Sequence, residues 1–149
     1  MVWLIAGIGC FFASLGFGIL FHIKGKSLIY ASISGAIGGM IYHLILEISH
    51  NEILAMFCAS FSFSLYSELM ARLCHSPVTT FIIPGLIPLV PGGGMYEMMV
   101  HAVEGNASLL MEKGLQTLSI AGVLVLGLIC ASALFKMFQM IRREYACNK

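Results

Sequence analysis

The sequence has very little charge. Only 10% of its 149 residues are Asp, Glu, Lys or Arg, and it contains no Asp at all. An ordinary soluble domain has about 25% charged residues, which cover its surface. The formal net charge of +1 gives no reason to expect a nucleic acid or an acidic substrate as a partner. These shortages exclude an ordinary soluble domain.

The chain also lacks the motifs that carry enzyme chemistry. The three glycines at 92–94 are not followed by the Lys and Ser/Thr of a phosphate loop, and there is no nucleophile elbow or metal-ligand run. The cysteines are odd in number and irregularly spaced, so we expect free thiols and no disulfide framework or metal site. We expect no catalysis, no cofactor and no bound metal. The cysteines are Cys10, Cys58, Cys74, Cys130 and Cys147.

Apolar sequence is abundant. Hydrophobic residues make up 59% of the chain, and the mean hydropathy is +0.95. A helix needs about 20 apolar residues to cross a membrane. No basic residue precedes the first apolar segment, so we interpret this segment as a membrane span and not as a signal peptide. The sequence predicts an all-α membrane protein, a single integral membrane domain over residues 1–149 with about five transmembrane helices. The expected spans are 1–22, 28–46, 53–73, 78–103 and 113–140, the fourth being broken by Pro and Gly.

Basic residues divide the loops into two groups. Lys and Arg collect in short cytoplasmic loops. In a five-span arrangement seven of the eight basic residues fall on one side, and only Lys113 falls on the other. This predicts a multi-pass protein of the inner (plasma) membrane, with its N-terminus outside and its C-terminus cytoplasmic. A four-span arrangement, with residues 78–103 re-entrant, fits the charges less well. The seven are Lys24, Lys26, Arg72, Lys136, Arg142, Arg143 and Lys149.

The segment at 84–94 is the most informative, because it holds three prolines and four glycines. Proline removes a backbone donor, and glycine does not restrain the backbone. We expect a helix break at membrane depth, which is tolerated only where it is buried or lines a wet cavity. Such breaks mark transporter binding sites. The alternative is a proline kink that only shapes the bundle.

A half-helix that starts after the break, at about Gly94, has free N–H groups that favour an anion such as a substrate carboxylate. We therefore expect alternating access around 84–94. The predicted substrate-binding residues are Pro88, Pro91, Gly92, Gly93, Gly94 and Tyr96.

Ionisable side chains at membrane depth are costly, so they are candidates for function. Glu97 and His101 lie one helical turn apart, and we predict that they couple transport to protons; the alternative is that both are hydrated at the outer interface. Glu68 and Arg72 have the same spacing near the cytoplasmic end of the third span, and we predict a structural ion pair.

Small residues recur at four-residue spacing in the expected helices. Gly35 and Gly39 are one such pair, and Gly127 and Ala131 are another. Small faces let helix backbones approach closely in lipid. The pattern predicts close packing inside the bundle, and contact with another subunit remains open as an alternative.

The run Ile83-Pro84-Gly85-Leu86-Ile87-Pro88-Leu89-Val90-Pro91-Gly92, followed by Tyr96, resembles the threonine/serine exporter family, and more closely its small YjjB-type membrane subunit. The resemblance covers roughly residues 28 to 130 and includes Arg72 and Pro77. It implies one half of an exporter whose other half is a larger membrane subunit. The motif carries over to Pro84, Pro88, Pro91, Gly92 and Tyr96.

The resemblance also implies a function. The family exports small hydrophilic metabolites, threonine and serine in some members and succinate-like dicarboxylates in others, using the proton gradient. An odd number of spans would make a homologous second half face the opposite way, as in inverted-repeat transporters. Two alternatives stay open: a scaffold or regulatory subunit with no translocation path of its own, and a channel-like homo-oligomer.

Overall fold

The computed structural model describes residues 2–147, with side chains as far as Ile141. The described chain is helical and holds no strand, which confirms an all-α membrane protein. Four of the helices are long and apolar enough to cross a membrane: α1, α2, α3 and α6. The elements are α1 (Val2–Leu20), α2 (Lys26–Ser49), α3 (Glu52–Leu73), α4 (Thr79–Leu86), the 3₁₀ helix η1 (Ile87–Leu89), α5 (Gly92–Val103) and α6 (Ala107–Cys147).

Local sequence sets the ends of the regular spans. Gly25, with φ of 70°, precedes α2, and His50 ends it in the left-handed conformation. Asn51 caps α3: its side-chain oxygen accepts hydrogen bonds from the N–H groups of Ile53 and Leu54, at 3.0 and 3.4 Å. These ends lie within a few residues of the predicted ones.

The contacts between helices fix the direction of each pass. A Cβ at Gly7 would meet Met40 and one at Gly18 would meet Leu28, so α1 and α2 are antiparallel. Ala31 packs in one cluster with Ala71, whereas Tyr42 packs in another with Met56, so α2 and α3 are antiparallel too.

Helices α3 and α6 are parallel. The Gln116 side chain donates a hydrogen bond to Glu52 at the start of α3, and the Arg72 guanidinium lies over the Phe135 ring near its end. The segment from α4 to α5 therefore returns the chain from the end of α3 to the start of α6. That it forms a fifth, broken span stays a prediction. We call the end with Arg72, Phe135 and the α1–α2 loop the basic end, and the end with Glu52 and Gln116 the cavity end.

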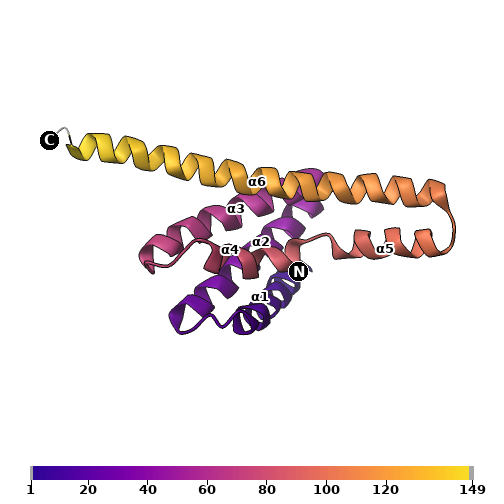
Figure 1. Cartoon of the computed structure of the whole chain (residues 1–149), viewed down its shortest axis with the longest axis horizontal. Helices are drawn as coiled ribbons and strands as arrows, with labels where there is room; N and C mark the ends of the chain where they lie inside the picture. The colour runs from indigo at the N-terminus through magenta and orange to yellow at the C-terminus, as the bar shows by residue number, and fades with distance from the viewer. Residues whose placement is uncertain (1, 148–149) are drawn as a thin grey trace.

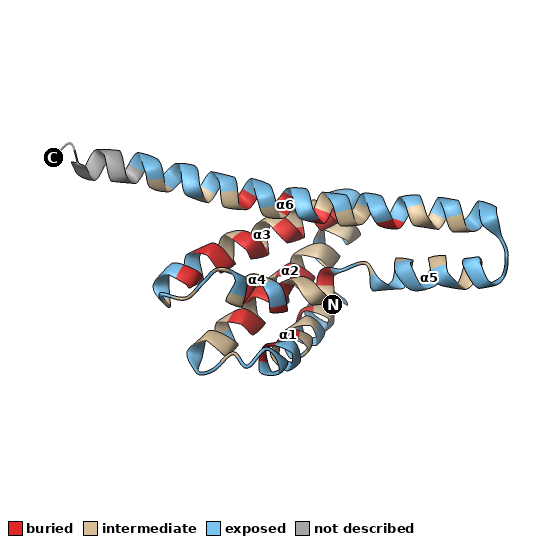
Figure 2. Ribbon diagram, in the orientation of Figure 1, coloured by how far each residue is buried: buried red, intermediate tan, exposed pale blue. Residues whose placement is uncertain are grey.

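The bundle is closely packed because small residues line its seams. A Cβ at Gly35 would collide with Ser14, one at Gly39 with Cys10, and one at Gly127 with Ser60. Buried positions concentrate in α2, α3 and α4, whereas α1 and α5 are largely exposed (Figure 2). The prediction of close packing inside the bundle is confirmed at these glycines.

The fourth segment is broken, but over a narrower stretch than predicted. Pro84 is accommodated inside α4, and Pro88 lies in η1. Only Val90 and Pro91, with ψ of 132° and 64°, leave the helical region. The three glycines at 92–94 are helical and form the first turn of α5, so the half-helix begins at Gly92 and not at Gly94.

Helix α6 is much longer than the predicted 113–140. It has 41 residues, or about 60 Å of helix, roughly twice the hydrocarbon thickness of a bilayer. Its N-terminal part and α5 form a hairpin that extends away from the other helices (Figure 1). None of the residues of α5 is buried.

Candidate functional site

A cavity of about 330 Å³ lies beside the break, at the cavity end of the bundle. One wall is the backbone from Pro88 to Gly94. The rest of the lining comes from Glu97 of α5 and from four other helices. They supply Cys10 from α1, Gly39, Tyr42 and His43 from α2, Glu52 and Met56 from α3, and Lys113, Gln116, Thr117 and Ile120 from α6.

The first turn of α5 opens on this cavity with free backbone donors. Helix α5 has no side-chain cap, and its first helical hydrogen bond runs from the Met95 N–H to the Pro91 carbonyl at 3.2 Å. The Gly92 N–H bonds the Val90 carbonyl at 2.7 Å. Gly93 and Gly94 therefore have no acceptor within the helix. Two N–H groups at the positive end of a helix form an environment that favours an anion.

The glycines of this turn have different surroundings. A Cβ at Gly93 would meet no atom within 4 Å, whereas a Cβ at Gly94 would collide with the Thr117 side chain of α6. Gly94 thus lets α5 pack closely on α6. Gly93 keeps space open next to the free N–H groups.

Charged groups of both signs line the cavity. The Lys113 ammonium forms an ion pair with the Glu97 carboxylate, with Nζ and Oε2 2.9 Å apart. The Gln116 amide donates to Glu52 Oε2 at 3.3 Å. Glu97 and Lys113 are partly exposed, at 53% and 36%. The site could therefore meet a negative group with backbone N–H groups and a positive group with carboxylates.

The structure brings most of the predicted site residues together. Pro88, Pro91, the glycines at 92–94 and Glu97 all line the cavity. Tyr96 does not, and it is 71% exposed. His101 does not line the cavity either, and its Nδ1 lies 3.2 Å from Glu104 Oε2. Glu97 and His101 thus have separate partners, and their role in proton coupling stays a prediction.

The predicted Glu68–Arg72 ion pair is not formed. The described residues form two salt bridges, and neither involves these side chains. Glu68 is buried, at 6% exposed, and the Arg72 guanidinium carbon lies 5.0 Å from the centre of the Phe135 ring. Arginine is attracted to the face of an aromatic ring, and here that contact joins α3 to α6.

Sequence reasoning missed the residues that other helices bring to the cavity. Tyr42, Gln116 and Thr117 carry no local signal, because they become neighbours of the break only when α2 and α6 pack beside it. Lys113 did carry a signal: it is the sole basic residue of its side. Within the described part of the chain, no three His, Cys, Asp or Glu side chains are placed so that they could hold a metal ion.

Comparison with known proteins gives a family and a curated relative to which the chain is similar. A family model described as threonine/serine exporter matches residues 6–134. An uncharacterised protein of Haemophilus influenzae is 26% identical over 153 residues, which cover 89% of this chain and 52% of that relative. The chain therefore spans about half the length of the curated relative. No solved structure matches.

Proposed function

The chain belongs to the threonine/serine exporter family, and from that premise we propose that it is the small subunit of a proton-coupled exporter of small carboxylate-bearing metabolites. The candidate substrates are threonine/serine-type amino acids and succinate-like dicarboxylates. The observation that carries the proposal is the cavity beside the break, onto which the uncapped first turn of α5 opens.

The cavity suits a small carboxylate in size and chemistry. Its volume of about 330 Å³ is at the low end of ligand pockets in general. A substrate carboxylate would accept hydrogen bonds from the N–H groups of Gly93 and Gly94. The ammonium of an amino acid would then face Glu52 or Glu97, whereas the second carboxylate of a dicarboxylate would face Lys113.

Alternating access would take place around Val90 and Pro91. These two residues are the only ones between η1 and α5 outside helical conformation, so a change in their backbone angles would move α5 relative to α4. Such movement would open the cavity to one side of the membrane or to the other. Proton binding at Glu97 or His101 would couple the outward step.

The larger membrane subunit would complete the translocation path. The chain spans about half of its curated relative, which agrees with one half of a two-part transporter. The parallel course of α3 and α6 supports a fourth segment that recrosses the membrane. An odd number of passes would then give a homologous second half the opposite orientation.

Efflux measurements test the proposal. Cells that express the chain with its larger subunit are loaded with a labelled panel that includes threonine, serine and succinate. We expect faster efflux of at least one carboxylate-bearing metabolite than in cells with the larger subunit alone. Equal efflux in both strains would reject an essential role and favour a scaffold.

Proteoliposomes discriminate the remaining alternatives. We expect flux to require both subunits and to depend on a proton gradient. Flux through the purified chain alone, without any gradient dependence, would indicate a homo-oligomeric channel. In the same preparation, Glu97→Gln should abolish the pH dependence of efflux if that carboxyl binds the coupled proton, and unchanged pH dependence would remove Glu97 from that role.

A further inference from the structure

The hairpin of α5 and the N-terminal part of α6 extends past the membrane-spanning part of the bundle. Gln116 is hydrogen-bonded to Glu52 at the start of α3, and Phe135 lies against Arg72 near its end. The stretch of α6 from Gln116 to Phe135 is about 29 Å of helix, which matches the hydrocarbon thickness of a bilayer. Because α6 is one continuous helix, residues 95–115 lie beyond the hydrocarbon at the cavity end.

One side of α5 is occupied by α6, the main partner of α5 among the described helices. Gly94 lies against the Thr117 side chain, and the Glu97 carboxylate forms its ion pair with Lys113. These contacts leave the opposite side of α5 without a helix to cover it. None of the residues of α5 is buried.

The uncovered side of α5 carries an apolar stripe. Met95, Met99 and Val103 follow one another at four-residue spacing, so they share one face of the helix. With 3.6 residues per turn, each lies about 100° or more around the helix axis from Gly94 and Glu97. The exposed fraction rises along the stripe, from 44% at Met95 to 66% at Met99 and 88% at Val103.

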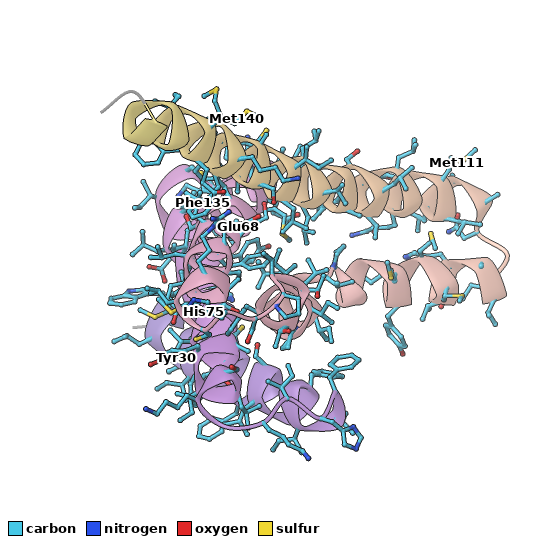
Figure 3. All side chains as sticks on the ribbon, turned by 60° about the vertical axis from the view of Figure 1, so that its left-hand side comes forward. Tyr30, Glu68, His75, Met111, Phe135 and Met140 are labelled. Atoms are coloured by element: carbon cyan, nitrogen blue, oxygen red, sulfur yellow. The ribbon has the colours of Figure 1, made fainter. Side chains whose placement is uncertain are left out.

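Apolar side chains beyond the hydrocarbon have no lipid tails to cover them. Contiguous exposed apolar surface outside a membrane is typical of a protein–protein contact. Four of the ten methionines of the chain lie in the hairpin, and methionine suits an adaptable contact surface. Figure 3 shows one of them, Met111, on the extended part of α6, far from Met140 near the other end of that helix. The four are Met95, Met98, Met99 and Met111.

The charge of the hairpin disfavours a second copy of the chain as the partner. Residues 95–115 hold three carboxylates, Glu97, Glu104 and Glu112, and one basic residue, Lys113. Two copies in the same orientation would bring these like charges together, which is unfavourable at an interface. A partner with basic residues around an apolar patch would complement the hairpin.

The relative of the chain and the position of the cavity favour the larger subunit. The chain spans 52% of the Haemophilus influenzae relative, so in that protein a segment of similar length is joined to the matching half. The hairpin also lines the cavity, through Glu97 and Lys113. A partner bound to the hairpin would therefore border the cavity, and in repeat-built transporters the substrate site lies at the interface between the repeats.

We propose that the apolar stripe Met95–Met99–Val103 is the surface on which the larger membrane subunit docks. The docking segment of that subunit presents an apolar patch with basic residues at its edge. By covering the stripe, it holds α5 in place and closes the cavity on the side of the hairpin. The identity of this partner rests on the proposed function.

Photo-cross-linking tests the contact directly. Val103 is replaced by the photoreactive residue benzoylphenylalanine in the full chain, which is co-expressed with the larger subunit and irradiated in the membrane. We expect a product that contains one copy of each subunit. Cross-linking of position 103 only to a second copy of the chain, only to lipid, or to nothing would overturn the proposal.

Co-purification measures the contribution of the stripe. We expect the tagged Met99→Lys variant to retain about tenfold less of the larger subunit than wild type, whereas Met99→Leu retains the wild-type amount. The matched control is Met140→Lys, the same change at a residue of α6 that is 73% exposed beyond the other end of the span. The melting temperature of the chain alone should be unchanged by Met99→Lys, because that side chain is exposed. Equal retention by Met99→Lys and Met140→Lys would overturn the proposal.

Both measurements are made without substrate, so their failure differs from failure of the proposed function. If the two subunits cross-link through position 103 but export nothing from the metabolite panel, the docking surface stands and the exporter function fails. If the pair exports a metabolite but position 103 does not cross-link to the larger subunit, the docking surface is wrong and the exporter function stands.

Discussion

The acidic residues at the two ends of the α3–α6 pair differ in burial and in their partners. At the cavity end, Glu97 is exposed and paired with Lys113, and Glu52 accepts a hydrogen bond from Gln116. At the basic end, Glu68 is buried and forms no ion pair with the described residues, and Arg72 lies over the Phe135 ring.

This difference suggests that the cavity end binds a ligand, whereas the basic end holds two helices together. The cavity end has open space, free backbone donors and fixed charges, which are the requirements of a binding site for a charged metabolite. The basic end has a close contact between two helices, in which Arg72 of α3 lies over the Phe135 ring of α6. Substitutions at the two ends should therefore have different consequences.

Filling the cavity should have the largest effect. Gly93→Leu places a side chain in open space beside the free N–H groups, so efflux should fall to the level of cells that lack the chain. The fold should survive, since glycine is a poor helix former and nothing lies within 4 Å of the new Cβ. The matched control is Gly122→Leu, at an exposed glycine of α6 with equally open surroundings. Normal efflux by Gly93→Leu would contradict the assignment of the cavity.

Overfilling the α3–α6 seam should chiefly affect stability. In Gly127→Val the new Cβ would approach the Phe57 carbonyl to about 3.1 Å and collide with Ser60. Overpacking of this kind lowers the free energy of unfolding by about 1–3 kcal/mol. Thermal unfolding in detergent measures the loss, with Gly9→Val as the control because a Cβ at Gly9 meets no neighbour. Equal melting temperatures for the two variants would show that the contact between α3 and α6 at Gly127 has room for a larger side chain.

Removing the Arg72 cation should have a smaller effect on stability. Arg72→Gln deletes the contact with Phe135, and cation–π contacts contribute about 0.5–2 kcal/mol. If the contact stabilises the seam, Phe135→Leu should add little to the loss in the Arg72→Gln background. Additive losses in this double-mutant cycle, followed by thermal unfolding, would show that the two side chains act independently.

Neutralising the exposed pair at the cavity end should scarcely change stability. Glu97→Gln and Lys113→Gln remove an ion pair that is open to solvent, and such pairs contribute little. Their unfolding midpoints should match that of wild type, even where efflux changes. A clear loss of stability in either variant would mean that this pair is more enclosed in the assembled transporter than in the chain alone.

Much of the fold could be predicted because each regular span carries its own signal. Runs of apolar residues ended by Gly25 or Asn51 gave the spans to within a few residues. The prolines located the broken fourth segment. The three glycines at 92–94 were harder to interpret, since glycine permits irregular backbone but does not require it, and packing against Thr117 favours helix there.

The partners of charged side chains could not be predicted from spacing along the chain. Residues four apart share a helix face, which favoured pairs of Glu97 with His101 and of Glu68 with Arg72. In the structure Glu97 pairs instead with Lys113, because the hairpin brings α6 alongside α5, and Arg72 reaches Phe135 because α6 runs parallel to α3. Both outcomes depend on tertiary contacts that the local sequence does not encode.

Substrate protection of a single thiol tests the central claim most directly, namely that the break lines the substrate site. Gly93→Cys and Gly122→Cys are made in a chain whose own cysteines are replaced by serine, and each is combined with the larger subunit. We predict that the exported metabolite slows thiol labelling at position 93 and leaves labelling at position 122 unchanged. Equal labelling at position 93 with and without a saturating exported metabolite would contradict the account.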